Sequence, residues 1–473
     1  RFIGLPVDND GDYFFVREVQ RPFHFFRDLT DEQYNAKLDL TYELNKKWDL
    51  KAGGFYTRKD RDFEELRYQL EDNQTDTEGF FDEYLSIDES EGDLQAYFSP
   101  SNTGLLGRAA NGDGIIGNSY VDQTRPQNLY TGNEQVIAGY GMAVYRASPR
   151  WKFIAGARVE ATDFGVETKD LQDQGAIDEV NVLPSLNAIF SYNEKVNWRL
   201  SATRTVARPN MRELAPFAAF DLLGSFPVVG NPDLELTQIT NLDLRYEFFP
   251  SSAELFAVSA FYKQFENPIV RELDVASDQP QYQYINTNTG NLGGLELEFR
   301  KNLDFISPAL TNFKFNANFT YIVSQVDLSD DEFETRRQLD EDIKSYRPFA
   351  FQSPYIVNLM LSYDHPESGW GANIYANAFG PRLAANGSGA APDEFQVYGR
   401  LNDQGEIEND IPVPELNIRI QKAINERLRL ALSVNNILDY SIVQYQEDRG
   451  RFFTTGAFNP GRIFTLSFNY TLK

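Results

Sequence analysis

The side chains that carry most enzyme chemistry are scarce in this sequence. Its 473 residues include two histidines, His24 and His365, and no cysteine. A catalytic triad or a zinc site needs such side chains gathered in one place. His365 precedes Pro366 in the segment YDHPESG, whose composition predicts a tight turn. Hydrolase and nucleotide-binding motifs are also missing, so we expect no catalytic residue, no enzyme activity, no cofactor and no metal site.

Carboxylates are the abundant reactive groups. The chain has 70 Asp and Glu against 44 Lys and Arg, a formal net charge of −26. Glycosidase-like carboxylate pairs arise by chance in such a chain, and its charge repels nucleic acid. Segments 71–94 and 328–343 concentrate the acidic residues, which predicts either cation or calcium binding or, as we favour, exposed solvated loops.

The elements that must position these side chains are strands. In GLELEFRK (294–301), apolar residues alternate with charged ones, the two-residue period of a strand with one apolar face. The same alternation recurs along the chain, and helical periodicity is hard to find. Further examples are residues 36–44, 151–161, 241–249, 312–321, 427–436 and 461–473.

The connections between these strands alternate in length. Tight polar turns such as NKK (45–47) and NEK (193–195) alternate with long segments such as 71–128 and 209–238. This asymmetry is typical of an outer-membrane β-barrel and is not expected of a soluble sandwich or adhesin. We count about sixteen strands and expect an all-β transmembrane antiparallel barrel, with the apolar face toward lipid and the polar face toward the lumen. All four tryptophans follow tight turns, as in an interfacial girdle: Trp48, Trp151, Trp198 and Trp370.

Several longer segments resemble the β-barrel of TonB-dependent receptors, especially those of the Bacteroidetes type. The match keeps its order over nearly the whole chain. It rests on ARPNMRELAPF (207–217), GNPDLELTQITNLDLRYEFFP (230–250), FYKQFENPI (261–269), GGLELEFRK (293–301), FQSPYIVNLMLSYD (351–364), VNNILDY (434–440) and NPGRIFTLSFNY (459–470).

The resemblance implies an outer-membrane transporter of Gram-negative bacteria, with a barrel of about 22 strands and an N-terminal plug. The TonB energy-transducing complex would act on that plug to import a scarce ligand of the siderophore, oligosaccharide or peptide class. Because our strand count is lower, we expect residues 1–473 to be the C-terminal part of the barrel, with the plug and the first strands absent from this sequence. The alternative is a complete pore of about sixteen strands.

Two groups of site residues follow from the resemblance. The strand residues expected to face the lumen and plug are Arg199, Asp243, Arg245, Glu247, Glu296, Glu298, Arg300 and Arg429. The loop residues expected to contact ligand, arginines for anionic groups and aromatics for flat ones, are Arg208, Arg212, Phe217, Phe220, Phe80, Phe81 and Tyr84. The alternative for Arg208, Arg212 and Glu213 is pairing that holds the shape of their own loop.

Expected partners are outer-membrane lipids, the TonB complex through a missing N-terminal region, and a surface lipoprotein or other subunits of an outer-membrane assembly. Two other functions stay open. The barrel could be an accessory or scaffold subunit, which absence of a plug and TonB box from the full gene would favour. It could also be a passive porin-like pore, which conductance would reveal.

Overall fold

The structure is a computed structural model of the chain. It describes residues 23–71, 105–108, 114–116, 119–169, 174–219, 227–274, 281–328, 330–339, 341, 343–387, 392–402, 404–407, 411–448 and 451–472. The described residues are mostly strand, as the alternation predicts, and the expected all-β class is confirmed. None of the helices in these ranges is long and apolar enough to cross a bilayer.

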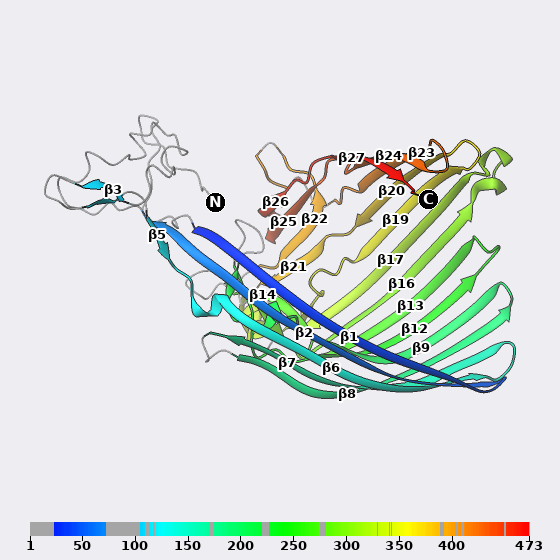
Figure 1. The fold of residues 1–473 in the computed structure, drawn as a ribbon, viewed down its shortest axis with the longest axis horizontal. Helices are drawn as coiled ribbons and strands as arrows, with labels where there is room; N and C mark the ends of the chain where they lie inside the picture. Colours follow the sequence, from blue (N-terminus) through cyan, green and yellow to red (C-terminus); the bar gives the residue numbers. More distant parts are fainter. Residues whose placement is uncertain are drawn as a thin grey trace. The chain divides into compact units, whose positions relative to one another are not determined.

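Seventeen of the described strands belong to one large sheet, the main sheet (Figure 1). They are β1 (Phe23–Asn45), β2 (Trp48–Glu71), β5 (Ser119–Asp122), β6 (Leu129–Arg146), β7 (Trp151–Thr168), β8 (Gln174–Asn193), β9 (Val196–Ala207), β12 (Thr237–Phe248), β13 (Leu255–Glu266), β16 (Thr289–Asn302), β17 (Phe313–Asp327), β18 (Tyr346–Arg347), β19 (Tyr355–His365), β20 (Trp370–Phe379), β23 (Glu415–Ala423), β24 (Leu428–Asn435) and β27 (Ile463–Tyr470).

The long connections supply a second sheet, which we call the connection sheet. Its eight strands, in order of pairing, are β10 (Ala218–Ala219), β11 (Val228–Val229), β15 (Gln281–Asn286), β14 (Ile269–Asp274), β21 (Arg382–Gly387), β22 (Glu394–Gly399), β25 (Ser441–Asp448) and β26 (Arg451–Phe458). The remaining described elements are the hairpin β3 (Leu105–Arg108) and β4 (Gly114–Ile116), the helices α2 (Met211–Leu214) and α3 (Asp330–Leu339), and the 3₁₀ turns η3 (Pro126–Asn128), η4 (Leu303–Phe305) and η5 (Pro308–Leu310).

The chain divides into two compact units. Unit 1 takes in ranges 1–32, 59–133 and 166–174, and unit 2 takes in 33–58, 134–165 and 175–473. In unit 1 the Glu65 carboxylate is fully buried. It accepts hydrogen bonds from Arg27 Nε (2.5 Å) and Asn128 Nδ2 (2.9 Å). The buried negative charge is therefore compensated, as burial of a carboxylate requires.

In unit 2 the strands of the main sheet follow one another as an antiparallel meander. The pairs run β8–β9, β9–β12, β12–β13, β13–β16, β16–β17, β17–β19, β19–β20, β20–β23, β23–β24 and β24–β27. The registers of β12 and β13 are unbroken, so Leu244 stands opposite Leu200 on β9 and Ala260 on β13. An unbroken register keeps every second side chain on the same face across many strands.

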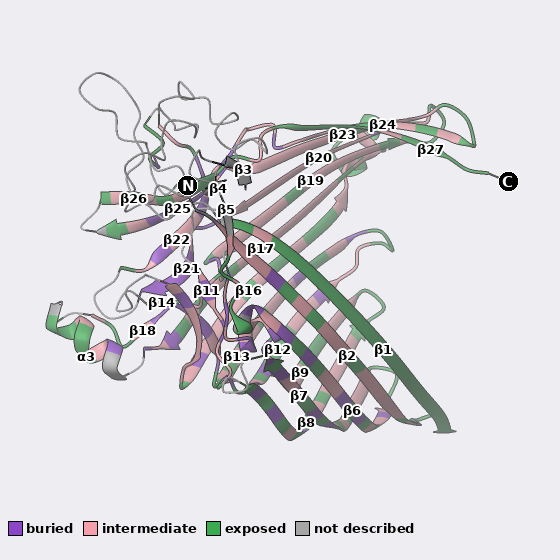
Figure 2. Cartoon of the chain, turned by 60° about the vertical axis from the view of Figure 1, so that its left-hand side comes forward, coloured by how far each residue is buried: buried purple, intermediate pink, exposed green. Residues whose placement is uncertain are grey.

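Exposure alternates along the strands of the meander, as the sequence pattern predicts (Figure 2). On the apolar face, Leu295 is 52% exposed, Tyr321 49% and Phe464 69%. These residues are not buried against a second sheet of the described chain. A large exposed apolar face indicates a surface that contacts another apolar phase, such as a membrane. The four tryptophans are also exposed, at 36–47%.

The tight turns between these strands share one device. The side-chain oxygens of Asn45, Asn193 and Asn425 each accept two backbone N–H groups, two and three residues further along the chain. Asparagine favours turns because its side chain can substitute for a backbone acceptor in this way. His365 is the last residue of β19, and its Nδ1 accepts from Ser368 N at 3.2 Å in the turn that follows.

Candidate functional site

The polar face of the main sheet carries paired charges from β9 to β16. Arg245 Nε donates to Glu247 at 3.0 Å, and its Nη2 donates to Glu298 at 2.7 Å. Arg199 Nε donates to Glu247 at 2.9 Å, while Arg300 lies 3.6 Å from Glu298. Each carboxylate thus faces two guanidinium groups. The network supplies the charge compensation that a partly buried wall needs.

The other residues predicted to face the lumen lie on the polar side of their strands. Glu296 accepts a hydrogen bond from Asn318 Nδ2 at 2.8 Å, across β16 and β17. Asp243 and Arg429 are exposed, on β12 and β24. Their contact with a plug stays a prediction.

The loop after β9 is held by contacts to the neighbouring wall. Arg208 Nη2 donates to Glu160 at 2.5 Å, and its Nε donates to Thr162 Oγ1 at 3.1 Å. Arg212 donates to the carbonyl oxygen of Val228 at 2.5 Å, and its guanidinium lies 4.2 Å from the ring of Phe217. These contacts pair both arginines with residues of the chain itself.

Helix α2 gives this loop its local shape. The Asn210 side chain accepts from Glu213 N at 3.0 Å, and the Glu213 side chain accepts from Asn210 N at 2.9 Å, a reciprocal capping box. Burial raises the pKa of Glu213 above its usual value, partly offset by that bond from Asn210. Phe217 is buried at 2% exposure. The structure therefore favours the shape-holding alternative here, and ligand contact by these residues stays a prediction.

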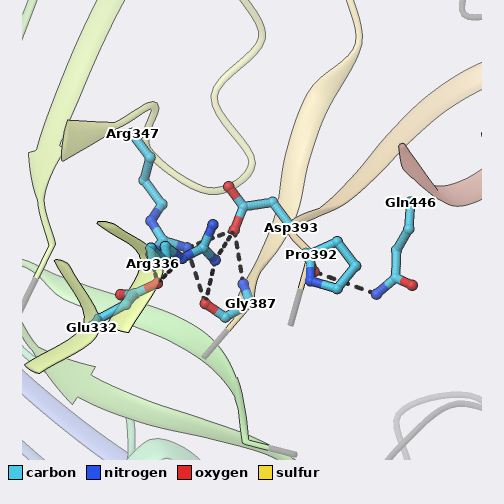
Figure 3. A network of polar contacts seen from close by, with 7 residues as sticks. All are labelled: Glu332, Arg336, Arg347, Gly387, Pro392, Asp393 and Gln446. Carbon is cyan, nitrogen blue, oxygen red and sulfur yellow. Dashed lines mark hydrogen bonds and ion pairs between the residues drawn. The ribbon is translucent and has the colours of Figure 1, made fainter. Parts of the chain in front are cut away.

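A cluster of four charges joins two long connections at α3 (Figure 3). Arg336 donates to Glu332 at 2.8 Å, one turn earlier on the helix, and to Asp393 at 2.9 Å. Arg347 on β18 donates to Asp393 at 2.7 Å and is ion-paired with Glu332. The carbonyl oxygen of Gly387 accepts from both arginines.

Burial makes this cluster different from the wall network. Arg347 is 5% exposed and Glu332 7%. Burial lowers the pKa of Arg347, against the attraction of Asp393 and Glu272. Segment 328–343 was expected to be a solvated loop, and the sequence showed little helical periodicity. The structure corrects the loop, because Asp330–Leu339 form α3, in which Glu332 and Arg336 pair one turn apart. The expected exposure holds for Glu334, Thr335 and Arg337.

A second buried carboxylate lies in the connection sheet. Glu394 is 3% exposed and accepts hydrogen bonds from the Tyr282 hydroxyl and from Thr455 Oγ1, the latter at 2.7 Å. Burial is the main cause that raises the pKa of Tyr282 well above its usual range. The Arg271 guanidinium stacks over the Tyr282 ring at 3.8 Å. Tyr282 also belongs to an apolar cluster with Val228 and Ala385, so the sheet has a core of its own.

The sequence missed the connection sheet and its buried charges. Arg336 lies four residues after Glu332, and that spacing was the available signal for α3. Arg347 and Asp393 gave none, because their contact joins segments 46 residues apart. The predicted ligand residues Phe80, Phe81, Tyr84 and Phe220 lie outside the described residues. Within the described ranges, no group of three or more His, Cys, Asp or Glu could hold a metal ion.

Comparison with known proteins gives a family match and a shared fold. A sequence model of the family described as TonB dependent receptor-like, beta-barrel matches residues 4–437. No curated protein matches the chain. Several solved structures match the chain at low sequence identity, and the match covers about half of the length of each of them.

Three of these structures illustrate the likeness. The siderophore receptor PiuA from Acinetobacter baumannii has a TM-score of 0.59 at 12% identity, over 94% of this chain and 56% of that one. The unliganded ferric citrate transporter FecA has a TM-score of 0.56 at 13% identity, over 94% of this chain and 55% of that one. A mutant of the ferric enterobactin receptor PfeA from Pseudomonas aeruginosa, in complex with enterobactin, has a TM-score of 0.52 at 15% identity. The match covers 94% of this chain and 54% of that one. At such identities the likeness concerns the fold.

Proposed function

This chain belongs to the TonB-dependent receptor β-barrel family, and from that premise we propose that it is part of an active transporter that imports a scarce ligand. Barrels of this family are outer-membrane proteins of Gram-negative bacteria, and the outer membrane is the location of this chain. The observation that carries the proposal is the contrast between faces. In one antiparallel meander, one face of the sheet is apolar and exposed, and the opposite face carries paired charges.

The proposed transport requires parts that other regions of the protein must supply. The chain spans about half the length of the solved structures that it matches. A plug, and a segment that contacts the TonB complex, would lie N-terminal to the strands described above. The paired charges of β9–β16 would then face the plug. Translation of the full gene tests this requirement directly.

The ligand class remains part of the proposal. PiuA, FecA and PfeA are named for a siderophore, ferric citrate and ferric enterobactin. Iron chelates are therefore the first ligands to test, with oligosaccharides and peptides as further classes. The buried clusters around Arg347 and Glu394 support a stable outer surface on which such a ligand could dock.

The test is uptake by cells that express the full-length protein. Accumulation of ferric enterobactin or ferric citrate that stops when TonB is deleted would support active transport. Conductance in planar bilayers provides the second measurement, because a plugged transporter is nearly closed. Large, steady, TonB-independent conductance with no energised uptake would contradict the proposal and favour a passive pore. If the cells show no uptake and the bilayers show no conductance, the accessory or scaffold role is favoured.

A further inference from the structure

Phe351 has a backbone conformation that its side chain disfavours. Its φ is 60°, in the left-handed region. The other described non-glycine residues with positive φ are asparagines and an aspartate, which tolerate this region: Asn267, Asn436 and Asp439. For a bulky residue such as phenylalanine the same conformation is a strained outlier.

A tight turn enforces this conformation. Gln352 N donates to the carbonyl oxygen of Phe349 at 3.3 Å, which closes a β-turn with Phe351 at its third position. Positive φ at that position is the mark of turns that prefer glycine there. Phe351 N also donates to the carbonyl oxygen of Leu383 in β21, at 2.6 Å. Glycine would satisfy both bonds without strain, so the backbone gives no reason for the phenyl ring.

Burial does not explain the ring either. Phe351 is 50% exposed, whereas Ser353 and Leu383 beside it are buried. The ring that anchors the turn is Phe349, whose centroid lies 4.9 Å from that of Phe265. The phenyl group of Phe351 is thus presented by a turn that other residues fix.

The turn lies over the polar face of the main sheet. Phe349 N donates to Ser324 Oγ at 3.2 Å. Ser324 alternates along β17 with Tyr321 and Val323, which are exposed on the apolar face. Ser324 therefore belongs to the opposite, polar side, and contact with lipid does not account for Phe351.

We propose that Phe351 is a ligand-contacting residue whose ring stacks on a flat, apolar ring face of the imported molecule. The inference deepens the proposed function and rests on it. Aromatic side chains bind such faces whether they belong to an aromatic group or to the C–H side of a pyranose. The strained turn holds the ring in place before ligand arrives, which reduces the ordering that binding requires.

The experiment compares three substitutions in the full-length protein, purified in detergent. Phe351→Gly and Phe351→Asn fit the left-handed backbone and remove the ring, while Phe351→Tyr keeps a ring. Phe453→Ala is the matched control, because Phe453 is 51% exposed in β26 with an ordinary φ. Titration calorimetry measures binding of cellohexaose, which has uncharged pyranose rings, of ferric enterobactin, which has aromatic rings, and of ferric citrate, which has none.

We expect the natural protein to bind one of the two ring-bearing probes. Phe351→Gly and Phe351→Asn should weaken that binding about tenfold, and Phe351→Tyr and Phe453→Ala should keep it. The melting temperatures of the Gly and Asn variants should equal or exceed that of the natural protein, because the strain is removed. Any ferric citrate binding should be unchanged.

Three results would overturn the inference. The first is that the natural protein binds neither ring-bearing probe. The second is that the Gly and Asn variants bind the probe as tightly as the natural protein does. The third is a lowered melting temperature in both variants, which would assign the ring to packing against another part of the protein. These results are separable from the proposed function. If uptake depends on TonB and the Gly and Asn variants bind ligand as the natural protein does, the transport function stands and the role of Phe351 is contradicted. If binding depends on the ring and there is no energised uptake, the role of Phe351 stands and the transport function is contradicted.

Discussion

The charge network on β9–β16 and the charge cluster at α3 and β18 are built in opposite ways. In the β9–β16 network, Arg199 is about half exposed and pairs with Glu247, whose side chain is 10% exposed. In the connection region, Arg347 and Glu332 are almost fully buried. Water screens the first pair and not the second, so the first contributes little to stability while loss of one partner from the second leaves an uncompensated charge. The wall can exchange its ion pairs with a neighbour, whereas the buried cluster fixes two connections to each other.

The largest expected effect comes from breaking the buried cluster. Arg347→Ala should lower the free energy of unfolding by about 3–5 kcal/mol, because Glu332 and Asp393 lose a cation in a buried place. Arg337→Ala on the exposed side of α3 is the control, with an effect below about 0.5 kcal/mol. Thermal unfolding followed by circular dichroism measures both. Equal stability of the two variants would mean that the cluster is not a structural clamp.

The next effect separates the two faces of one strand. Phe319 is on the apolar face and its neighbour Asn318 on the polar face, beside Glu296 and Glu298. Phe319→Lys should cost about 2–4 kcal/mol near the bilayer midplane, while Asn318→Lys gains carboxylate neighbours and should cost less than about 1 kcal/mol. The fraction of protein that folds into lipid vesicles measures the difference. Similar folding of both variants would contradict the outward orientation of the apolar face.

The sequence predicted the main sheet because its signals are local. Alternation in residues 294–301 assigned Leu295 and Glu296 to opposite faces, and the asparagines of the tight turns marked where strands end. The TonB-dependent family was also predicted, from segments that keep their order, and the family match confirms it. The Bacteroidetes type stays a prediction.

The connection sheet could not be predicted in the same way. Its strands are short, and β11–β15 and β14–β21 pair in parallel between distant segments. Contacts such as Arg347 with Asp393 depend on tertiary structure and leave no periodic pattern. The left-handed φ of Phe351 was equally hidden, because sequence favours glycine or asparagine at such a position.

A smaller effect tests how the turn at Phe349 packs against the main sheet at Gly290. A Cβ at this position would lie 2.3 Å from Phe349 Cζ, so Gly290→Ala must push that ring away from Phe265. We expect a loss of about 1–3 kcal/mol. Gly293→Ala, on the same strand, has no atom nearer than 3.5 Å and should be close to neutral. Chemical denaturation compares them, and equal midpoints would show that the Phe349 turn is not tightly packed.

The smallest effect concerns an exposed pair in unit 1. Hydrogen bonds from Arg61, at 2.7 Å to both carboxylate oxygens, lower the pKa of Asp31 to about 2. Asp31 lies farther from the tight turn at Asn45 than the roughly 9–11 residues that cross hydrocarbon, so this carboxyl is in water. Because the folded-state pKa is below the usual 3.8, the pair's contribution is complete above that pH and is lost as pH falls toward about 2.

Solvent screening limits the contribution of this pair to below about 1 kcal/mol, since Asp31 is 32% exposed. Asp31→Asn should therefore reduce stability slightly at pH 7 and less at pH 2, where about half of the folded natural protein has lost the same charge. Melting temperatures at the two pH values measure this, with Asp243→Asn as the control, an exposed carboxylate on the wall. A loss at pH 2 as large as at pH 7 would assign the role of Asp31 to hydrogen bonding of the neutral side chain and not to its charge. Such a result would mean that this exposed pair stabilises the fold through hydrogen bonds, whereas the buried cluster stabilises it by compensating charge.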